Sequence, residues 1–173
     1  MKFKKKIVIL LYLSVIVCYC NKIIAQTKSD WTSLFNGKDL NGWFIRGKAV
    51  WTVQDGTLIG EGVMGHIYTD LTFNDFEVKG TFRITINGNS RFYFRANPPA
   101  DNPDGFPRGY EAQICNSQDA YTGWLWKPGT PTGKATELLT KDGEWFNHRL
   151  RATGDHIQFW INDKLVMTYD NNE

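Results

Sequence analysis

The sequence predicts an all-β domain, folded as a sandwich or a barrel. Turn dipeptides recur along most of the 173-residue chain, short β-rich runs lie between them, and helical periodicity is nearly absent. Many short strands separated by regular turns are typical of sandwiches and barrels. The turn signals are Asn36-Gly37, Asn41-Gly42, Asp55-Gly56, Asn87-Gly88, Asp104-Gly105, Asp142-Gly143 and Gly154-Asp155.

The strands can be placed between these turns. In chain order, the expected strands are 43–46, 50–53, 57–60, 66–69, 75–86, 90–96, 109–115, 145–153, 156–161 and 164–169. Tight hairpin turns are expected at Asp55-Gly56, Asn87-Gly88 and Asn162-Asp163, because such residues reach positive φ at low cost. Residues 97–107 and 123–133 are rich in Pro and Gly and are expected to be exposed loops, which are often functional when long.

Three central runs alternate apolar and polar residues with a period of two, as strands with one buried face do. They are residues 75–83, 89–95 and 109–114. The apolar set is Phe76, Val78, Phe82, Phe92, Phe94, Tyr110, Ala112 and Ile114. The opposite face carries Glu77, Lys79, Arg83, Arg91, Tyr93, Arg95, Glu111 and Gln113. If these strands are neighbours, the polar side chains share one surface, and that surface is the predicted functional site.

Residues 1–25 have the order of a secretory signal peptide. A start with four lysines precedes the apolar run 7–17. This run is shorter than the roughly 20 residues that a transmembrane helix needs, so we expect no stable membrane insertion. Cys18 and Cys20 lack the small residues that precede a lipoprotein cysteine, which makes lipid anchoring the less favoured alternative. The sequence therefore predicts export to the periplasm or outside the cell, and a single domain over residues 26–173.

The composition of the expected mature chain argues against nucleic acid as a partner. Removal of residues 1–25 leaves 15 of the 20 Lys and Arg but all 18 Asp and Glu, a net charge of −3 in place of +2. No basic stripe remains that would follow a phosphate backbone. The remainder holds all seven Trp, which indicates a large core, a sugar-stacking surface, or both.

Motifs along the chain resemble the 3-keto-disaccharide hydrolase domain family, which is common in secreted bacterial proteins. The resemblance covers about residues 31–170. The motifs are Trp31-Thr32-Ser33-Leu34-Phe35-Asn36-Gly37-Lys38-Asp39-Leu40-Asn41-Gly42-Trp43, Trp51-Thr52-Val53-Gln54-Asp55-Gly56-Thr57-Leu58, Tyr68-Thr69, Asp75-Phe76-Glu77, Phe82-Arg83, Gly88-Asn89-Ser90, Phe94-Arg95, Gly109-Tyr110-Glu111-Ala112-Gln113-Ile114 and Glu144-Trp145-Phe146-Asn147.

The resemblance implies a concanavalin A-like β-sandwich, or jelly roll, whose concave sheet faces carbohydrate. It also implies cleavage of sugars that a separate oxidoreductase has already oxidised at C3. Two features depart from the family pattern. Arg91 stands where members usually have Gly, and the family's last strands would follow residue 173. We therefore expect a C-terminally truncated copy that lacks the last strands of the sandwich.

The implied chemistry assigns roles to the polar face. A ketone at C3 makes the C2 proton acidic, because its loss gives an enolate; the C1 substituent then leaves, and water adds later. Such a site needs a base, a cation or donor at the enolate oxygen, and an acid for the leaving oxygen. We assign Glu111 as the base, Arg95 as the oxyanion partner and Tyr93 as the acid. We expect no cofactor, since the His and Cys residues lack ligand spacing. A divalent ion held by Glu111 stays an alternative.

Five further residues are expected to bind a carbohydrate substrate. Gln113 and Asn89 would hold its hydroxyl groups. Trp124 and Trp126 lie in a Pro- and Gly-rich segment and would stack on a sugar ring. Arg91 would either reach into the cleft or narrow it.

Each assignment has a structural alternative. Glu111 and Arg95 would also be explained as a cross-strand ion pair, and Tyr93 as a stacking residue. Two hypotheses therefore compete with the enzyme: a non-catalytic carbohydrate-binding module, and an inactive truncated copy.

Overall fold

The computed structural model describes residues 31–171. Every strand described below lies in one compact unit that begins at Ser33. The predicted signal peptide, residues 1–25, lies outside the described residues. Within the described residues, no helix has the length and apolar character that crossing a bilayer requires.

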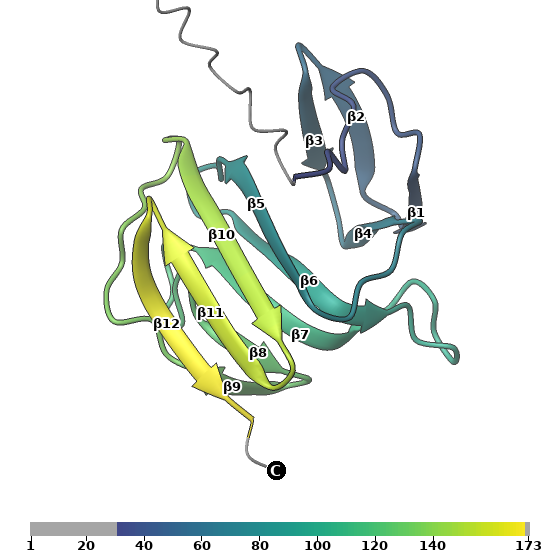
Figure 1. Cartoon of the computed structure of the whole chain (residues 1–173). Coiled ribbons are helices and arrows are strands. Elements are labelled where there is room, and N and C mark those ends of the chain that lie inside the picture. Colours follow the sequence, from purple (N-terminus) through teal and green to yellow (C-terminus); the bar gives the residue numbers. More distant parts are fainter. Residues whose placement is uncertain (1–30, 172–173) are drawn as a thin grey trace, which may run out of the picture. The chain divides into compact units, whose positions relative to one another are not determined.

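The described part of the chain folds into twelve strands that pair in antiparallel ladders (Figure 1). Two sheets have four strands each, in the orders β12-β11-β10-β5 and β6-β7-β8-β9, and the pairs β1-β4 and β2-β3 form two-stranded sheets. The strands are β1 (Trp43–Gly47), β2 (Val50–Gln54), β3 (Thr57–Glu61), β4 (Gly65–Thr69), β5 (Phe76–Phe82), β6 (Asn89–Asn97), β7 (Arg108–Cys115), β8 (Leu125–Lys127), β9 (Thr130–Gly133), β10 (Phe146–Thr153), β11 (His156–Ile161) and β12 (Lys164–Asp170).

The two four-stranded sheets pack face to face and enclose the core. Alternate residues of each strand point inward, as the period of two requires. In β10 the buried and solvent-facing positions alternate along its whole length. The buried apolar residues come from both sheets, and they are Ile84, Phe94, Ala112, Ile114, Leu125, Ala135, Phe146, Leu150, Ala152, Ile157, Phe159, Ile161, Val166 and Met167. The predicted all-β sandwich is therefore confirmed.

The pairing of the three central strands differs in part from the expected pairing. β6 and β7 are neighbours, in the register Tyr93↔Glu111 and Arg91↔Gln113. β5 instead pairs with β10, where Glu77 lies opposite Arg151. The polar residues of β5 therefore belong to the outer face of the other sheet. A period of two assigns the faces of a strand but not its neighbours.

Two of the three expected hairpin turns are confirmed. Asp55 and Gly56 have φ values of 49° and 73° between β2 and β3, and Asn162 and Asp163 have 48° and 63° between β11 and β12. Positive φ at both central residues is the type I′ geometry that suits the twist of a hairpin. The hairpin predicted at Asn87-Gly88 is wrong, because this turn connects β5 and β6, which lie in different sheets.

The segment 123–133 is not the loop that its Pro and Gly content predicted. It forms β8 and β9, which pair through Leu125↔Gly133 and extend the β6-β7 sheet. Gly123 begins the segment with φ 96°, and its N–H donates to the carbonyl of Gln113 at 3.0 Å. Hydrogen bonding to β7 overrides the local composition. Residues 98–107, by contrast, contain no strand, as expected of the loop between the two central strands.

His148 is buried in the sandwich core, 3% exposed, between the rings of Phe82 and Phe159. Its Nε2 has no hydrogen-bond partner among the described residues. Burial disfavours the charged imidazolium and lowers the pKa of His148 to about 4. His148 is therefore neutral in the folded protein at physiological pH.

This burial predicts acid-sensitive folding. Between pH 6.5 and 4 the unfolded chain takes up a proton at His148 that the folded chain does not, so stability falls as the pH falls. The full loss is about 3 kcal/mol by pH 4. We expect His148→Leu to flatten this part of the stability profile, measured by urea unfolding at pH 7.5 and pH 4.5. An equal loss in the wild type and the variant would contradict the assignment to His148.

Candidate functional site

A groove of about 360 Å³ lies on the outer face of β6, β7 and β8. Its floor is formed by strand residues whose neighbours along the chain point into the core. Phe106 and Pro107, from the loop between β6 and β7, form one wall. The groove is lined by Arg91, Tyr93, Phe106, Pro107, Arg108, Gly109, Glu111, Gln113, Gln118, Trp126, Lys127, Pro128 and Gly129.

Glu111 occupies the middle strand of this floor and is held by Arg91. Nε of Arg91 donates to Oε1 of Glu111 at 2.9 Å, and the two side chains are 29% and 16% exposed. The guanidinium of Arg91 also lies 5.5 Å from the centre of the Phe106 ring. The bond to Glu111 uses Nε, so the two terminal amino groups of Arg91 remain without a hydrogen-bond partner among the described residues.

Tyr93 lies directly across the ladder from Glu111. Its pKa is raised, first by burial and then by the negative charge of Glu111, while the positive charge of Arg91 acts in the opposite direction. A hydrogen bond with Glu111 raises the pKa of Tyr93 further. The phenol therefore keeps its proton at neutral pH and acts as a donor.

Gln113 presents an acceptor at the buried end of the floor. The side chain is 2% exposed, and its Nε2 donates to Oδ1 of Asn89 at 3.3 Å. Its Oε1 is buried without a partner among the described residues. A buried amide oxygen in this state is costly, so a hydroxyl donor entering the groove would relieve the cost.

The two tryptophans of the expected stacking pair separate in the structure. Trp126 lies opposite Glu111 in the β7–β8 ladder and lines the groove. Trp124 packs against the core and meets the Tyr121 ring with centroids 6.0 Å apart. Leu125, between them, is fully buried. The structure therefore brings Trp126 to the site and does not bring Trp124.

Arg95 does not reach the groove. A bulge interrupts β6 between Phe94 and Asn97, and Arg95 itself has φ 47°. Its guanidinium donates to the carbonyls of Asn74 and Gly154 and to Oδ1 of Asp75 at 3.1 Å. The alternative of a cross-strand ion pair between Glu111 and Arg95 is wrong, because the bulge turns Arg95 out of the alternation, and Glu111 pairs with Arg91 instead.

His66 joins the site from a distant part of the chain. It lies on β4, and its ring centre is 5.7 Å from that of Tyr93 and 5.9 Å from that of Phe106. Burial, with a smaller effect of the Arg91 charge, lowers the pKa of His66, so its ring is neutral. The sequence assigns no role to His66, because the histidines of the chain lack metal-ligand spacing. No local pattern predicts its position, because the β1–β4 ladder sets it.

The acidic groups of the groove are few. Glu111 is its one carboxylate among the described lining residues. Glycosidases that use two carboxylates need a second one across the bond, and the described lining offers none. In the part of the chain that the structure describes, no three His, Cys, Asp or Glu residues gather where they could hold a metal ion.

The fold is shared with solved structures of carbohydrate-related proteins. A candidate glycosyl hydrolase from Parabacteroides distasonis has a TM-score of 0.69 and 24% identity, over 82% of this chain and 72% of that chain. The carbohydrate-binding module CBM66 from Bacillus subtilis has a TM-score of 0.59 and 16% identity, over 76% and 81%. A second candidate glycosyl hydrolase from P. distasonis has a TM-score of 0.50 and 22% identity, and this chain spans 61% of it. These identities show the fold alone.

Family membership rests on the sequence itself. No curated protein matches the chain. The model of the 3-keto-alpha-glucoside-1,2-lyase-like domain matches residues 30–173, which include every strand and every residue of the groove. This chain therefore belongs to the 3-keto-alpha-glucoside-1,2-lyase-like domain family.

Proposed function

We propose that this protein is a lyase that cleaves the glycosidic bond of 3-keto-glycosides by elimination. The observation that carries the proposal is the arrangement at Glu111: a single carboxylate beside a guanidinium and a protonated phenol, on the floor of an open groove. An elimination needs one base, one stabiliser of negative charge and one acid. It needs no second carboxylate.

In the proposed step Glu111 removes the proton from C2, which the C3 ketone has made acidic. The C2–H electrons pass into the enolate of the C3 ketone; its collapse forms the C1=C2 double bond as the C1–O bond breaks. Tyr93 gives its proton to the leaving oxygen, so the products are an alcohol and a 2-hydroxy enone. Glu111 then returns the C2 proton to Tyr93 along their hydrogen bond, and both groups are restored. Later addition of water to the enone would complete a net hydrolysis.

Arg91 takes the place expected of Arg95 in this proposal. Charge develops on the C3 oxygen as the enolate forms, and the terminal amino groups of Arg91 supply positive charge and donors beside the base. Gln113 and Asn89 would hold substrate hydroxyls, and Trp126 would support a sugar ring. The same groups would bind a sugar whether or not a divalent ion assists.

The test is turnover of a 3-keto-β-glucoside labelled with deuterium at C2, with and without added divalent metal. Elimination predicts release of the aglycone, growth of the ultraviolet absorbance of the enone, and a primary isotope effect, because the C2–H bond breaks. A cleavage that passes through an oxocarbenium ion leaves the C2–H bond intact, and would show only a small secondary effect with no enone.

The two tryptophans provide a matched pair of variants. Trp126→Ala should raise KM about 3- to 10-fold, because an aromatic platform contributes about 0.5–1.5 kcal/mol beyond its buried area. Trp124→Ala should leave KM near the wild-type value and lower the midpoint of thermal unfolding, because Trp124 packs on the core. Initial rates and thermal melts of both variants separate these effects. A larger KM effect at Trp124 would contradict the placement.

A second candidate is a carbohydrate-binding module without catalysis. The aromatic lining favours it: Phe106 is 55% exposed at the wall of the groove, and Trp126 lies on its floor. A folded protein that binds the glycoside and never releases its aglycone would establish this function and exclude the lyase.

Export remains part of the proposal. A secreted lyase would meet its substrates in the periplasm or outside the cell, as the pattern of residues 1–25 predicts. N-terminal sequencing of the protein from the producing cell tests this: a mature chain that begins near residue 26 supports export, and an intact Met1 contradicts it.

A further inference from the structure

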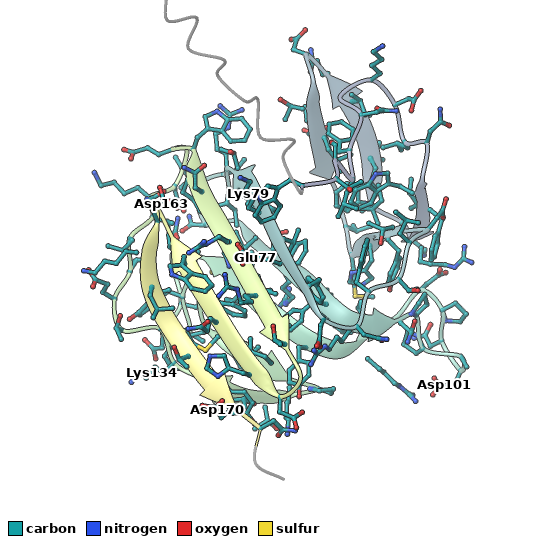
Figure 2. All side chains as sticks on the ribbon, in the orientation of Figure 1. Glu77, Lys79, Asp101, Lys134, Asp163 and Asp170 are labelled. Atoms are coloured by element: carbon teal, nitrogen blue, oxygen red, sulfur yellow. The ribbon has the colours of Figure 1, made fainter. Side chains whose placement is uncertain are left out.

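A second hollow, of about 430 Å³, lies on the outer face of the sheet formed by β5, β10 and β11. It belongs to the four-stranded sheet that does not carry the groove, and the two share no lining residue. Figure 2 shows Lys79 and Asp163 toward the same end of this sheet, with Glu77 farther along β5. The side chains used below are Lys79, Thr81, Asn147, Arg149, Trp160 and Asp163.

Arg149 lines this hollow beside Trp160. The carbon at the centre of its guanidinium lies 4.0 Å from the centre of the Trp160 ring, in cation–π contact. Contact with an aromatic ring restricts the position of a guanidinium. The position is therefore pre-organised before any ligand arrives.

The charge of Arg149 is weakly matched inside the protein. Its neighbour Glu77 is engaged mainly by Arg151, whose Nε donates to Oε2 of Glu77 at 2.6 Å. The contact from Nη1 of Arg149 to Glu77 is longer, at 3.4 Å. Nε of Arg149 is buried with no partner among the described residues. The Arg149 side chain as a whole is 34% exposed, so its terminal amino groups can engage a further acceptor from solvent.

A second cation lies beside the first. Lys79 and Arg149 are direct partners in the β5–β10 ladder, and Arg149 and Trp160 are partners in the β10–β11 ladder. The three side chains therefore form one row across the sheet. A carboxylate bound at Arg149 would therefore lie beside a second positively charged side chain.

The rest of the hollow is polar and includes one acidic group. Hydroxyl Oγ1 of Thr81 donates to Oδ1 of Asn147 at 3.1 Å, and Asp163 stands at the hairpin turn between β11 and β12. Asp163 would repel a doubly charged phosphate or sulfate. It would accept hydrogen bonds from the hydroxyls of a sugar. The combination fits a ligand that carries one negative charge and several hydroxyls.

We propose that this hollow binds a uronic acid unit of an acidic polysaccharide. The carboxylate would lie against Arg149 and Lys79, with ring hydroxyls at Asp163 and Asn147. A hollow of this volume is within the ordinary range for small-molecule sites and admits more than one sugar ring. Binding there would hold the protein on an acidic glycan while the groove on the other sheet stays open. The inference does not depend on the proposed elimination.

The test is calorimetric titration of the protein with digalacturonic acid. We expect Arg149→Met to weaken binding roughly 10- to 100-fold, because a bidentate, charge-assisted pair is lost. Arg83→Met removes the same charge outside the hollow, where Arg83 lies over the Trp145 ring, and should change the affinity less than about threefold, as expected for a screened distant charge. Cellobiose, which lacks the carboxylate, and inorganic sulfate, which lacks the hydroxyls, should both bind far more weakly to the wild type.

Any of the following three results would overturn the proposal. Equal losses in the two variants would mean that general charge attraction holds the ligand. If sulfate bound as tightly as digalacturonic acid, the site would not recognise the sugar hydroxyls. If cellobiose bound as tightly, the site would not recognise the carboxylate. If Arg149→Met does not fold, as judged by circular dichroism, the comparison of the three ligands on the wild type still decides.

Discussion

Replacement of Glu111 by Gln should abolish turnover of a 3-keto-glycoside while the protein stays folded and still binds sugar. The amide has nearly the same shape as the carboxylate but cannot accept the C2 proton. Loss of a positioned general base lowers kcat by about 10²- to 10⁴-fold. The expected readout is kcat from aglycone release, with KM changed far less than kcat.

The control for this experiment is Glu137→Gln. Glu137 forms an exposed ion pair with Lys164 and lines neither the groove nor the second hollow. It should leave kcat and KM unchanged. If Glu111→Gln kept near-wild-type turnover in the presence of a chelator, Glu111 would not be the base, and neutral His66 beside Tyr93 would become the next candidate.

Arg91→Met should lower kcat, whereas Arg95→Met should lower the stability of the fold. Arg91→Met should lower kcat about 10²- to 10³-fold, as removal of one oxyanion donor does, because Arg91 lies beside Glu111 in the groove. Arg95→Met should leave kcat unchanged and destabilise the fold by about 1–3 kcal/mol, because two backbone carbonyls and Asp75 lose their donor. Steady-state kinetics and urea unfolding of both variants measure the two effects.

The assignment would be contradicted if Arg95→Met, and not Arg91→Met, lowered kcat. A large fall in kcat for Arg95→Met, with stability unchanged, would return the oxyanion role to Arg95. A fall in both kcat and stability for Arg91→Met would show that Arg91 mainly holds Glu111 in place. Arg91→Lys separates these cases, because lysine keeps the charge but not the planar donors.

The faces of the central strands could be predicted because alternation is a local property. Phe94 and Ala112 are buried, and Glu111 lies on the groove side, as the period of two requires. The Asp55-Gly56 hairpin is local in the same sense, since positive φ at both residues sets its geometry. The family motif 109–114 also predicted that Glu111 and Gln113 lie in the site. This prediction is local as well, because both residues lie on the same face of one short strand.

The features that the sequence did not predict depend on contacts between distant segments. Arg95 follows the alternation in the sequence, but the bulge in β6 turns it toward Asn74 and Gly154. Trp124 and Trp126 have the same local composition around them, yet only Trp126 reaches the groove. The outcome in each case depends on the pairing partner, which a period of two does not specify.

The amino-acid sequence alone specifies that this chain forms a β-sandwich, which residues of each central strand face the core, and to which family the chain belongs. These follow from residue spacing, turn chemistry and motif order, all of which act over a few positions. The neighbours of β5, the partner of Glu111, the position of His66 and the second hollow became known only from the folded structure. Each of these depends on hydrogen-bonded ladders between strands far apart in the chain, and packing of the whole sandwich selects among the registers that local pattern allows.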